Sequence, residues 1–208
     1  KCAELGIDMT DRIPVAPAAH YTVGGVKTDL TGRTNIPHLY VCGELASSGI
    51  MGANRLASNS LIECLVFGKR AVEDSVRNRR EDPIPETMPL FSLDREKLDA
   101  YLSLKNKVAD IMTQEAGIIR TENGLQEGLE TLLRLEQTEI FEENEYYSLV
   151  SKNLLTVAEL IIRSALFRKE SRGGHFRSDY PTPNDDYVCH IIQQKGKEIK
   201  TTPVIQNN

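Results

Sequence analysis

The 208-residue sequence lacks most of the features that mark membrane-spanning and nucleic-acid-binding proteins. It has no apolar run long enough to cross a bilayer, which takes about 20 consecutive apolar residues. The net charge is only −5 and the acidic and basic residues are interspersed, so no basic surface is expected. No internal repeat or low-complexity tract stands out. We therefore predict neither a nucleic acid nor a membrane as a partner.

Cysteine is scarce as well, with four residues scattered along the chain. Their spacing shows none of the close pairs that are typical of metal sites, so no metal is expected. The pattern indicates reduced thiols and a cytoplasmic protein. Cys42 and Cys64 are predicted to be buried, where a free cysteine behaves as a small hydrophobic residue.

The length and the composition bound the domain organisation. The sequence begins abruptly at Lys1, and we expect it to be a piece of a longer protein. Its length allows one domain or two small ones. Charged residues and prolines concentrate in residues 78–89, which is typical of a linker, so a domain boundary is predicted there.

A loop of small residues leads into a predicted helix between Gly49 and Glu63. Gly49 and Gly52 allow a close approach of the backbone to a ligand, and Arg55 carries a planar fork of donors suited to a carboxylate or a phosphate. Ser60 and Glu63 have the spacing of a capping box, which predicts a helix start near Ser60 whose backbone N–H groups favour an anion. Taken singly, each residue is better explained as part of an ordinary helix cap or as a surface side chain.

Two strands are predicted before this loop. The β-branched alternation after Tyr21 indicates the first, and Gly24 and Gly25 indicate a bulge or a close backbone approach. The second, residues 39–42, stops at Gly-Glu, as strands do at the ligand edge of an α/β sheet. Glu44 is then placed to accept hydrogen bonds from hydroxyls such as those of a ribose, although a solvated turn carboxylate is the alternative.

Three helical segments follow the linker, at residues 93–115, 121–140 and 146–169. Their apolar residues recur at helical spacing and their connections are short, which predicts an antiparallel three-helix bundle. Such a bundle by itself could equally be a docking module.

Beyond the helices, residues 168–181 gather glycines, arginines and His175 in a segment predicted to be irregular. His175 either lines an interface between domains or caps the third helix. His38 and His190 are predicted to be structural. The tail, with residues 187–192 and 198–200 on either side of a glycine, is predicted to form a hairpin or edge strands.

Two of these segments carry a resemblance to a known family. Gly-Ala-Asn-Arg-Leu-Ala-Ser-Asn-Ser-Leu-Ile-Glu, ending at Glu63, resembles a segment of the L-aspartate oxidases, which are relatives of the succinate dehydrogenase and fumarate reductase flavoproteins. Glu-Ser-Arg-Gly-Gly-His, ending at His175, resembles a second segment of the same family. Residues 57–63 resemble the oxidase form, because the dehydrogenases are closer to Gly-Ala-Asn-Ser-Leu-Leu-Asp at this place.

The resemblance implies an α+β fragment, in which the C-terminal piece of an FAD-binding α/β domain is followed by an antiparallel three-helix bundle and a short β tail. The regions expected are the end of a capping domain at 1–20, the C-terminal segment of the FAD-binding domain at 21–82, the three-helix bundle with its linker at 83–180, and the C-terminal tail at 181–208.

The resemblance also implies roles for individual residues. Glu44, Ser60 and Leu61 are expected to bind FAD, and His20 and Arg55 to hold the carboxylates of L-aspartate or fumarate. From spacing alone His20 would be a core histidine of a strand, but its Ala-His-Tyr-Thr-x-Gly-Gly context favours substrate binding. The arginine that transfers protons in the family lies upstream, so no catalytic residue is expected in this chain.

The reaction implied is oxidation of L-aspartate to iminosuccinate in NAD biosynthesis, with oxygen (giving hydrogen peroxide) or fumarate as the acceptor and quinolinate synthase as an expected partner. A succinate dehydrogenase or fumarate reductase flavoprotein is the nearest alternative. A non-catalytic helical interaction module, in which residues 90–170 bind a partner, is another.

The chain alone is expected neither to hold FAD tightly nor to turn over. The family's amino-terminal Gly-x-Gly-x-x-Gly fingerprint and most of its capping domain are not in this sequence. An absorption spectrum of the purified chain checks this prediction, and stoichiometric flavin would contradict it.

Overall fold

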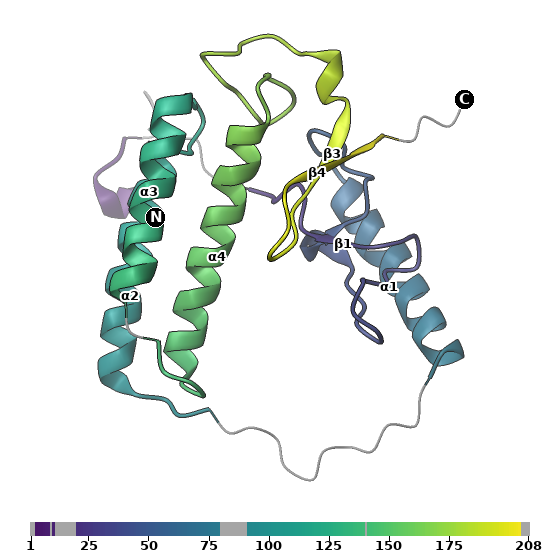
Figure 1. Cartoon of the computed structure of the whole chain (residues 1–208), viewed down its shortest axis with the longest axis horizontal. Coiled ribbons are helices and arrows are strands. Elements are labelled where there is room, and N and C mark those ends of the chain that lie inside the picture. The colour runs from purple at the N-terminus through teal and green to yellow at the C-terminus, as the bar shows by residue number, and fades with distance from the viewer. Residues whose placement is uncertain (1–2, 9, 11–19, 80–90, 140, 205–208) are drawn as a thin grey trace. The chain divides into compact units, whose positions relative to one another are not determined.

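The computed structural model describes residues 3–8, 10, 20–79, 91–139 and 141–204. The chain divides into two compact units, Lys1–Arg79 (unit 1) and Arg80–Asn208 (unit 2). The described residues form a helix-rich α+β structure with four α-helices and two small two-stranded sheets (Figure 1). The elements of unit 1 are η1 (Ala3–Leu5), β1 (Val26–Lys27), η2 (Gly43–Leu45), β2 (Ala46–Ser47) and α1 (Asn59–Arg77). Those of unit 2 are α2 (Arg95–Gln114), α3 (Glu122–Thr138), α4 (Tyr146–Phe167), η3 (Asp185–Tyr187), β3 (Cys189–Ile192) and β4 (Lys200–Pro203).

Helix α1 buries the opposite side from the one that its apolar residues suggest. Its buried residues are Glu63, Phe67 and Ala71, which recur at intervals of four and therefore share one face. This face packs against η2. Leu61 and Leu65, from the apolar stripe of the sequence, are 71% and 75% exposed in unit 1.

Unit 1 has less strand than the sequence predicts. β1 and β2 pair in parallel over two residues each, with Val26 opposite Ala46. The prediction of a strand at residues 39–42 is wrong, because Tyr40 forms only an isolated antiparallel bridge with Arg33. A strand needs a continuous ladder of hydrogen bonds to a neighbouring strand. Next to the tight turn around Gly32, residues 39–42 form only a short ladder with residues 32–34.

The prediction that Cys42 and Cys64 are buried is also wrong. Both side chains are exposed. Cys64 follows the buried Glu63 directly, and adjacent residues of a helix do not share a face. Its side chain therefore lies off the buried side of α1.

In unit 2, helices α2, α3 and α4 pack against one another around a common core (Figure 1). The buried apolar residues are Leu104, Val108, Ala116, Leu125, Leu132, Leu155, Ala158, Ile162 and Ala165. Each fully buried leucine or isoleucine stabilises the fold by about 1.5–3 kcal/mol. Gly128 lets α3 approach α4 closely, since a Cβ there would lie 3.2 Å from Cδ1 of Ile162.

Side-chain caps define where these helices begin. The residue before each helix accepts a hydrogen bond from a backbone N–H of the first turn, which satisfies a donor that has no partner within the helix. These capping residues are Asp94, Thr121 and Glu145. The three predicted helices are therefore confirmed, with starts within two residues of those expected from the sequence.

The tail forms the predicted hairpin, in which β3 pairs antiparallel with β4.

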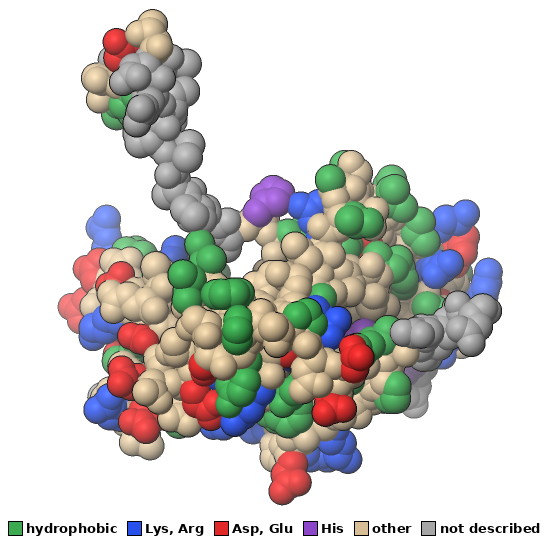
Figure 2. All heavy atoms as spheres, turned by 90° about the horizontal axis from the view of Figure 1, so that it is seen from above, with side chains coloured by type: hydrophobic (Ala, Val, Ile, Leu, Met, Phe, Trp, Pro, Cys, Tyr) green, Lys and Arg blue, Asp and Glu red, His purple; other side chains and the backbone are tan. Residues whose placement is uncertain are grey.

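No helix in the described part of the chain has the length and apolarity needed to span a membrane. Acidic and basic side chains are interspersed on the face shown in Figure 2. Most of residues 1–20 lies outside the described residues. The division of the chain into four regions stays a prediction.

Candidate functional site

The start of α1 differs from the predicted capping box. The helix begins at Asn59, and its cap residue Ser58 has a φ of 70° and accepts no hydrogen bond with its side chain. Ser60 lies inside the first turn, where its hydroxyl accepts a hydrogen bond from Nη1 of Arg55 at 3.2 Å. The capping box is wrong because Glu63 is buried and hydrogen-bonded elsewhere. The first turn therefore keeps the anion preference of a helix N-terminus without a capping side chain.

Arg55 is held against the helix start by two uncharged groups. Its guanidinium lies over the ring of Tyr21, with the central carbon 4.7 Å from the ring centroid, and it donates to the hydroxyl of Ser60. A cation over an aromatic face is attracted by about 0.5–2 kcal/mol. Because neither partner is an anion, the arrangement orients the guanidinium without neutralising its charge. It can still pair with a carboxylate.

Tyr21 is fixed at its other end by Glu63. The phenol donates to Oε2 of Glu63 at 3.1 Å, and the hydroxyl of Ser48 donates to Oε1. Burial, followed by the hydrogen bond to Glu63 and by the charges of Glu63 and Glu44, raises the pKa of Tyr21. Sequence patterns alone do not predict this contact. The available signal was a single carboxylate, Glu63, within the otherwise apolar run from Leu61 to Phe67.

Glu44 lies in η2, directly before the short parallel sheet. Its Oε1 accepts a hydrogen bond from the backbone N–H of Thr22 at 2.7 Å. Glu44 is exposed, and the hydrogen bonds to it from residues 20–79 reach only Oε1, so its second oxygen can accept from a ligand. His20 is also exposed and precedes Tyr21 and Thr22, both of which are anchored. The fold thus gathers the segments that carry His20, Glu44, Arg55 and Ser60.

Gly25 stands where a side chain would not fit. Its φ is 149°, and a Cβ would lie 2.2 Å from the carbonyl oxygen of Leu45. Leu45 belongs to η2, so this contact sets how closely the segment of His20 approaches Glu44. Glycine is required here both for the backbone conformation and for the space.

We expect Gly25→Ala to lower the free energy of unfolding of unit 1 by about 1–3 kcal/mol, because the backbone is strained and must move away from Leu45. Urea denaturation followed by circular dichroism measures this. The control is Gly68→Ala, since Gly68 lies inside α1 with open space around its Cβ position. Gly68→Ala is expected to be neutral or slightly stabilising. Equal losses of unfolding free energy in the two variants would contradict the requirement for glycine at position 25.

In unit 2, the arginine-rich segment forms a network around Glu170, which is fully buried. Its carboxylate accepts hydrogen bonds from Arg168, Arg172 and the backbone N–H of Asn184. Burial alone would raise the pKa of Glu170, but these donors outweigh it and hold the pKa at about 2. Arg168 also donates to the carbonyl of Cys189 in β3. The network therefore ties the end of α4 to the tail.

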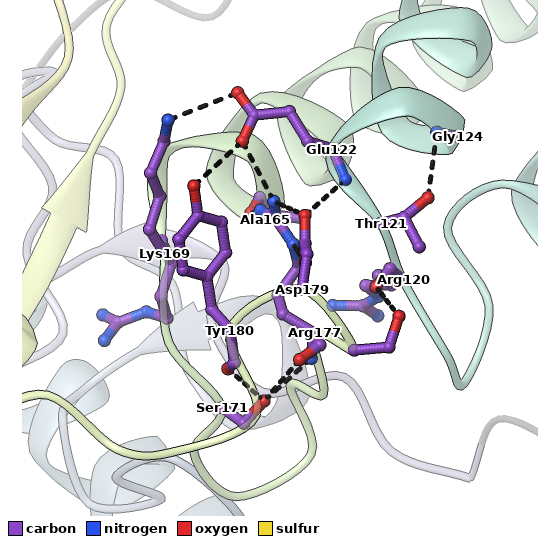
Figure 3. A network of polar contacts seen from close by, with 12 residues as sticks. Arg120, Thr121, Glu122, Gly124, Ala165, Lys169, Ser171, Arg177, Asp179 and Tyr180 are labelled. Carbon is purple, nitrogen blue, oxygen red and sulfur yellow. Dashed lines mark hydrogen bonds and ion pairs between the residues drawn. The ribbon is translucent and has the colours of Figure 1, made fainter.

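A second network surrounds Arg177, whose side chain is also fully buried (Figure 3). Arg177 forms two hydrogen bonds with Asp179, at 2.8 and 2.7 Å, and donates to the carbonyl of Ala165 at 2.9 Å. Glu122, at the start of α3, lies 3.3 Å from the same guanidinium. The hydrogen bonds from Arg177 hold the pKa of Asp179 at about 2, although partial burial opposes them. Arg177 thereby joins α3, α4 and the irregular segment.

His175 accepts a hydrogen bond from Nη1 of Arg120 at Nδ1 (2.9 Å) and donates from Nε2 to the carbonyl of Arg168 (3.0 Å). The two contacts require the neutral ring with its proton on Nε2. Arg168 is the C-cap residue of α4, so His175 caps this helix, which is one of its two predicted roles. Burial, and then the charges of Arg120, Arg168 and Arg177, lower the pKa of His175 despite the hydrogen bond to Arg168.

The stability of unit 2 is expected to fall on acidification below pH 6.5, the usual pKa of histidine. The folded state disfavours protonation of His175, so the unfolded state binds more protons between the folded-state pKa and 6.5, and stability rises with pH across that window. Urea denaturation at pH 5 to 8 measures the slope of the free energy of unfolding against pH. His175→Gln should flatten it, whereas His190→Gln, outside this network, should retain it. An unchanged slope in His175→Gln would contradict the prediction.

Two family models match the chain. Residues 105–208 match "Fumarate reductase flavoprotein C-term", which covers α3, α4 and the tail. Residues 1–61 match "FAD binding domain", which covers Glu44, Arg55 and the start of α1. The cofactor of the family is therefore FAD.

Curated relatives extend the likeness to most of the sequence. L-aspartate oxidase from Nostoc sp. is 39% identical in an alignment 226 positions long, and the match covers 93% of this chain and 39% of the relative. L-aspartate oxidase from Pseudomonas aeruginosa is 41% identical over 194 residues, which cover 87% of this chain and 35% of the relative. The chain thus spans less than half the length of these relatives.

Solved structures agree with the family models. A variant of E. coli quinol fumarate reductase FrdA matches 98% of this chain and 40% of its own, with a TM-score of 0.76 and 28% identity. A quinol-fumarate reductase with menaquinol molecules matches 99% of this chain and 41% of its own, with a TM-score of 0.78 and 26% identity. The chain therefore belongs to the fumarate reductase flavoprotein C-terminal family, within the superfamily of succinate dehydrogenase and fumarate reductase flavoproteins.

Proposed function

We propose that the chain is the C-terminal part of an FAD-dependent L-aspartate oxidase. The observation that carries this proposal is Arg55, whose charged guanidinium is oriented at the start of α1 by the Tyr21 ring and Ser60. The relatives from Nostoc and Pseudomonas, both named L-aspartate oxidase, support the oxidase branch.

The finer architecture is part of the proposal. Unit 1 is the C-terminal piece of an FAD-binding α/β domain, and α2, α3 and α4 form an antiparallel three-helix bundle that is followed by a short β tail. The mutual packing of the three helices and their short connections support this arrangement.

The residues at the start of α1 fit FAD. Glu44 has a carboxylate oxygen available for a hydroxyl of the ribityl or ribose group. The backbone N–H groups of Ser60 and Leu61 lie in the first turn of a 19-residue helix, where negative charge is favoured. We infer that these three residues hold FAD, which accepts a hydride from the substrate when it is bound.

The substrate proposed is a C4 dicarboxylate, L-aspartate or fumarate. Arg55 binds one carboxylate with its fork of donors, and His20 donates a hydrogen bond to another substrate oxygen. The anchors of Tyr21 and Thr22 limit the movement of His20, so the two groups can orient the Cα–H bond of L-aspartate for transfer. The reaction proposed yields iminosuccinate and, with oxygen as the acceptor, hydrogen peroxide.

The cellular setting follows from this reaction. Iminosuccinate would supply NAD biosynthesis through quinolinate synthase, and the enzyme is proposed to act in the cytoplasm. A helical adaptor is less well supported, because the flavoprotein family model covers α3 and α4 themselves.

An assay of the full-length enzyme with FAD tests the proposal. Peroxide formation with L-aspartate is measured beside succinate oxidation with an artificial electron acceptor. Peroxide from L-aspartate is expected. Oxidation of succinate without turnover of L-aspartate would instead assign the protein to the dehydrogenase branch, which the likeness to the fumarate reductase structures keeps as the alternative.

A further inference from the structure

Glu63 is a buried carboxylate next to the candidate site. It has no role in the proposed binding of FAD or of the substrate. It lies in the second turn of α1 with 2% of its surface exposed. Burial of a carboxylate is costly unless hydrogen bonds compensate it. Here the hydroxyls of Tyr21 and Ser48 compensate it, and they come from segments 42 and 15 residues away in the sequence.

These contacts connect Glu63 to Arg55 through a single ring. The phenol oxygen of Tyr21 is bound to Glu63, and the face of the same ring lies 4.7 Å from the guanidinium carbon of Arg55. A tyrosine side chain has two torsions, and the hydrogen bond at its hydroxyl fixes where the ring lies. The position of that face in turn selects the orientation of Arg55.

The same contact also limits the segment that carries His20. Tyr21 is anchored by its phenol at Glu63, and Thr22 is anchored by its backbone N–H at Glu44. Two consecutive anchored residues leave His20 little freedom relative to α1. Glu63 therefore affects both groups that are proposed to bind the dicarboxylate.

We propose that Glu63 is a positioning residue for the dicarboxylate site, acting through Tyr21 on Arg55 and His20. The inference rests on the proposed function, in which Arg55 and His20 bind the substrate. Glu63 itself touches neither group. Its loss releases the Tyr21 ring, and Arg55 must then be ordered when the ligand binds, which costs affinity.

The decisive variant is Tyr21→Phe in the full-length enzyme with FAD, because it keeps the ring and removes only the link to Glu63. The Kd of succinate, followed by the change in flavin absorbance, and the KM of L-aspartate are both expected to rise about tenfold. The kcat should stay within about threefold, since the reacting groups remain.

Tyr40→Phe is a matched control. Tyr40 donates to Oδ2 of Asp74 at 2.7 Å, so it also joins a tyrosine hydroxyl to a carboxylate of α1, away from Arg55. Equal thermal midpoints in the two variants, with weaker binding only in Tyr21→Phe, support positioning over a general loss of stability. Wild-type affinity in Tyr21→Phe overturns the inference.

Glu63→Gln and Glu63→Ala test the carboxylate directly. Glutamine can still form hydrogen bonds with both hydroxyls, so it should recover most of the affinity that alanine loses. If Glu63→Ala does not fold, Tyr21→Phe decides by itself. If Glu63→Gln and Glu63→Ala both fold and lose the same affinity for the dicarboxylate, the inference is contradicted.

A titration separates this inference from the proposed function. The phenol of Tyr21 is measured by ultraviolet absorbance, with Tyr21→Phe identifying its signal. Burial, the hydrogen bond to Glu63 and the charge of Glu63 raise the pKa of Tyr21 above 10.0. In Glu63→Gln the charge is lost, so the pKa of Tyr21 should fall toward 10.0. An unchanged pKa would exclude the link whatever the enzyme binds. A wild-type enzyme that binds no dicarboxylate would overturn the proposed function and, with it, the role given to Glu63.

Discussion

Replacing Arg55 by alanine in the full-length enzyme is expected to lower kcat/KM for L-aspartate by about 10²–10³-fold, which corresponds to about 3–4 kcal/mol. Its guanidinium is held by a ring face and a hydroxyl, and neither supplies negative charge. The substrate carboxylate is therefore its proposed counter-ion. Steady-state peroxide formation and the Kd of succinate measure the loss.

Two further variants sharpen this test. Arg55→Lys keeps the charge but loses the planar fork, so it should restore only part of the affinity. Arg33→Ala removes an arginine of the same unit that pairs with Asp74 on α1, and it should change kcat/KM little. Binding of L-aspartate within threefold of wild type in Arg55→Ala would show that Arg55 does not hold the substrate.

Arg177→Met is expected to lower the free energy of unfolding of unit 2 by about 3–5 kcal/mol, the usual cost of removing one partner of a buried ion pair. The guanidinium is fully buried, and its removal takes two hydrogen bonds from Asp179 and one from the carbonyl of Ala165 (Figure 3). Asp179 then keeps the backbone N–H of Glu122 as a donor. Glu122 loses a partner in the same change. Urea denaturation of the chain at pH 7, followed at 222 nm, measures the effect.

At low pH, the difference in free energy of unfolding between Arg177→Met and the wild type should become smaller. The pKa of Asp179 is about 2 in the folded protein and 3.8 in the unfolded reference, so its contribution to stability is complete above pH 3.8 and is lost as the pH falls to about 2. Arg163→Met is the control, because Arg163 pairs with Glu159 one turn away and is 40% exposed. Such a pair contributes about 0.5 kcal/mol or less. A loss below about 1 kcal/mol in Arg177→Met would contradict the central role of Arg177.

The helices of unit 2 could be predicted from the sequence because their determinants are local. Apolar residues at helical spacing place one face of each helix in the core, and capping residues such as Asp94 and Thr121 lie directly before the first turn. In unit 1 the same reasoning was wrong. Ser60 and Glu63 have the spacing of a capping box, but Glu63 contacts Tyr21 and Ser48, which local spacing does not reveal.

The sequence by itself determined the family and the segments that carry the candidate site, because those motifs are contiguous runs of residues around Arg55 and His175. Only the tertiary structure decided how their side chains are held. Glu63, Glu170 and Arg177 each have a partner from a segment distant in the sequence, which is Tyr21, Asn184 and Glu122 respectively. Buried charges require such partners, since water no longer solvates them, and no local pattern states which distant segment supplies them.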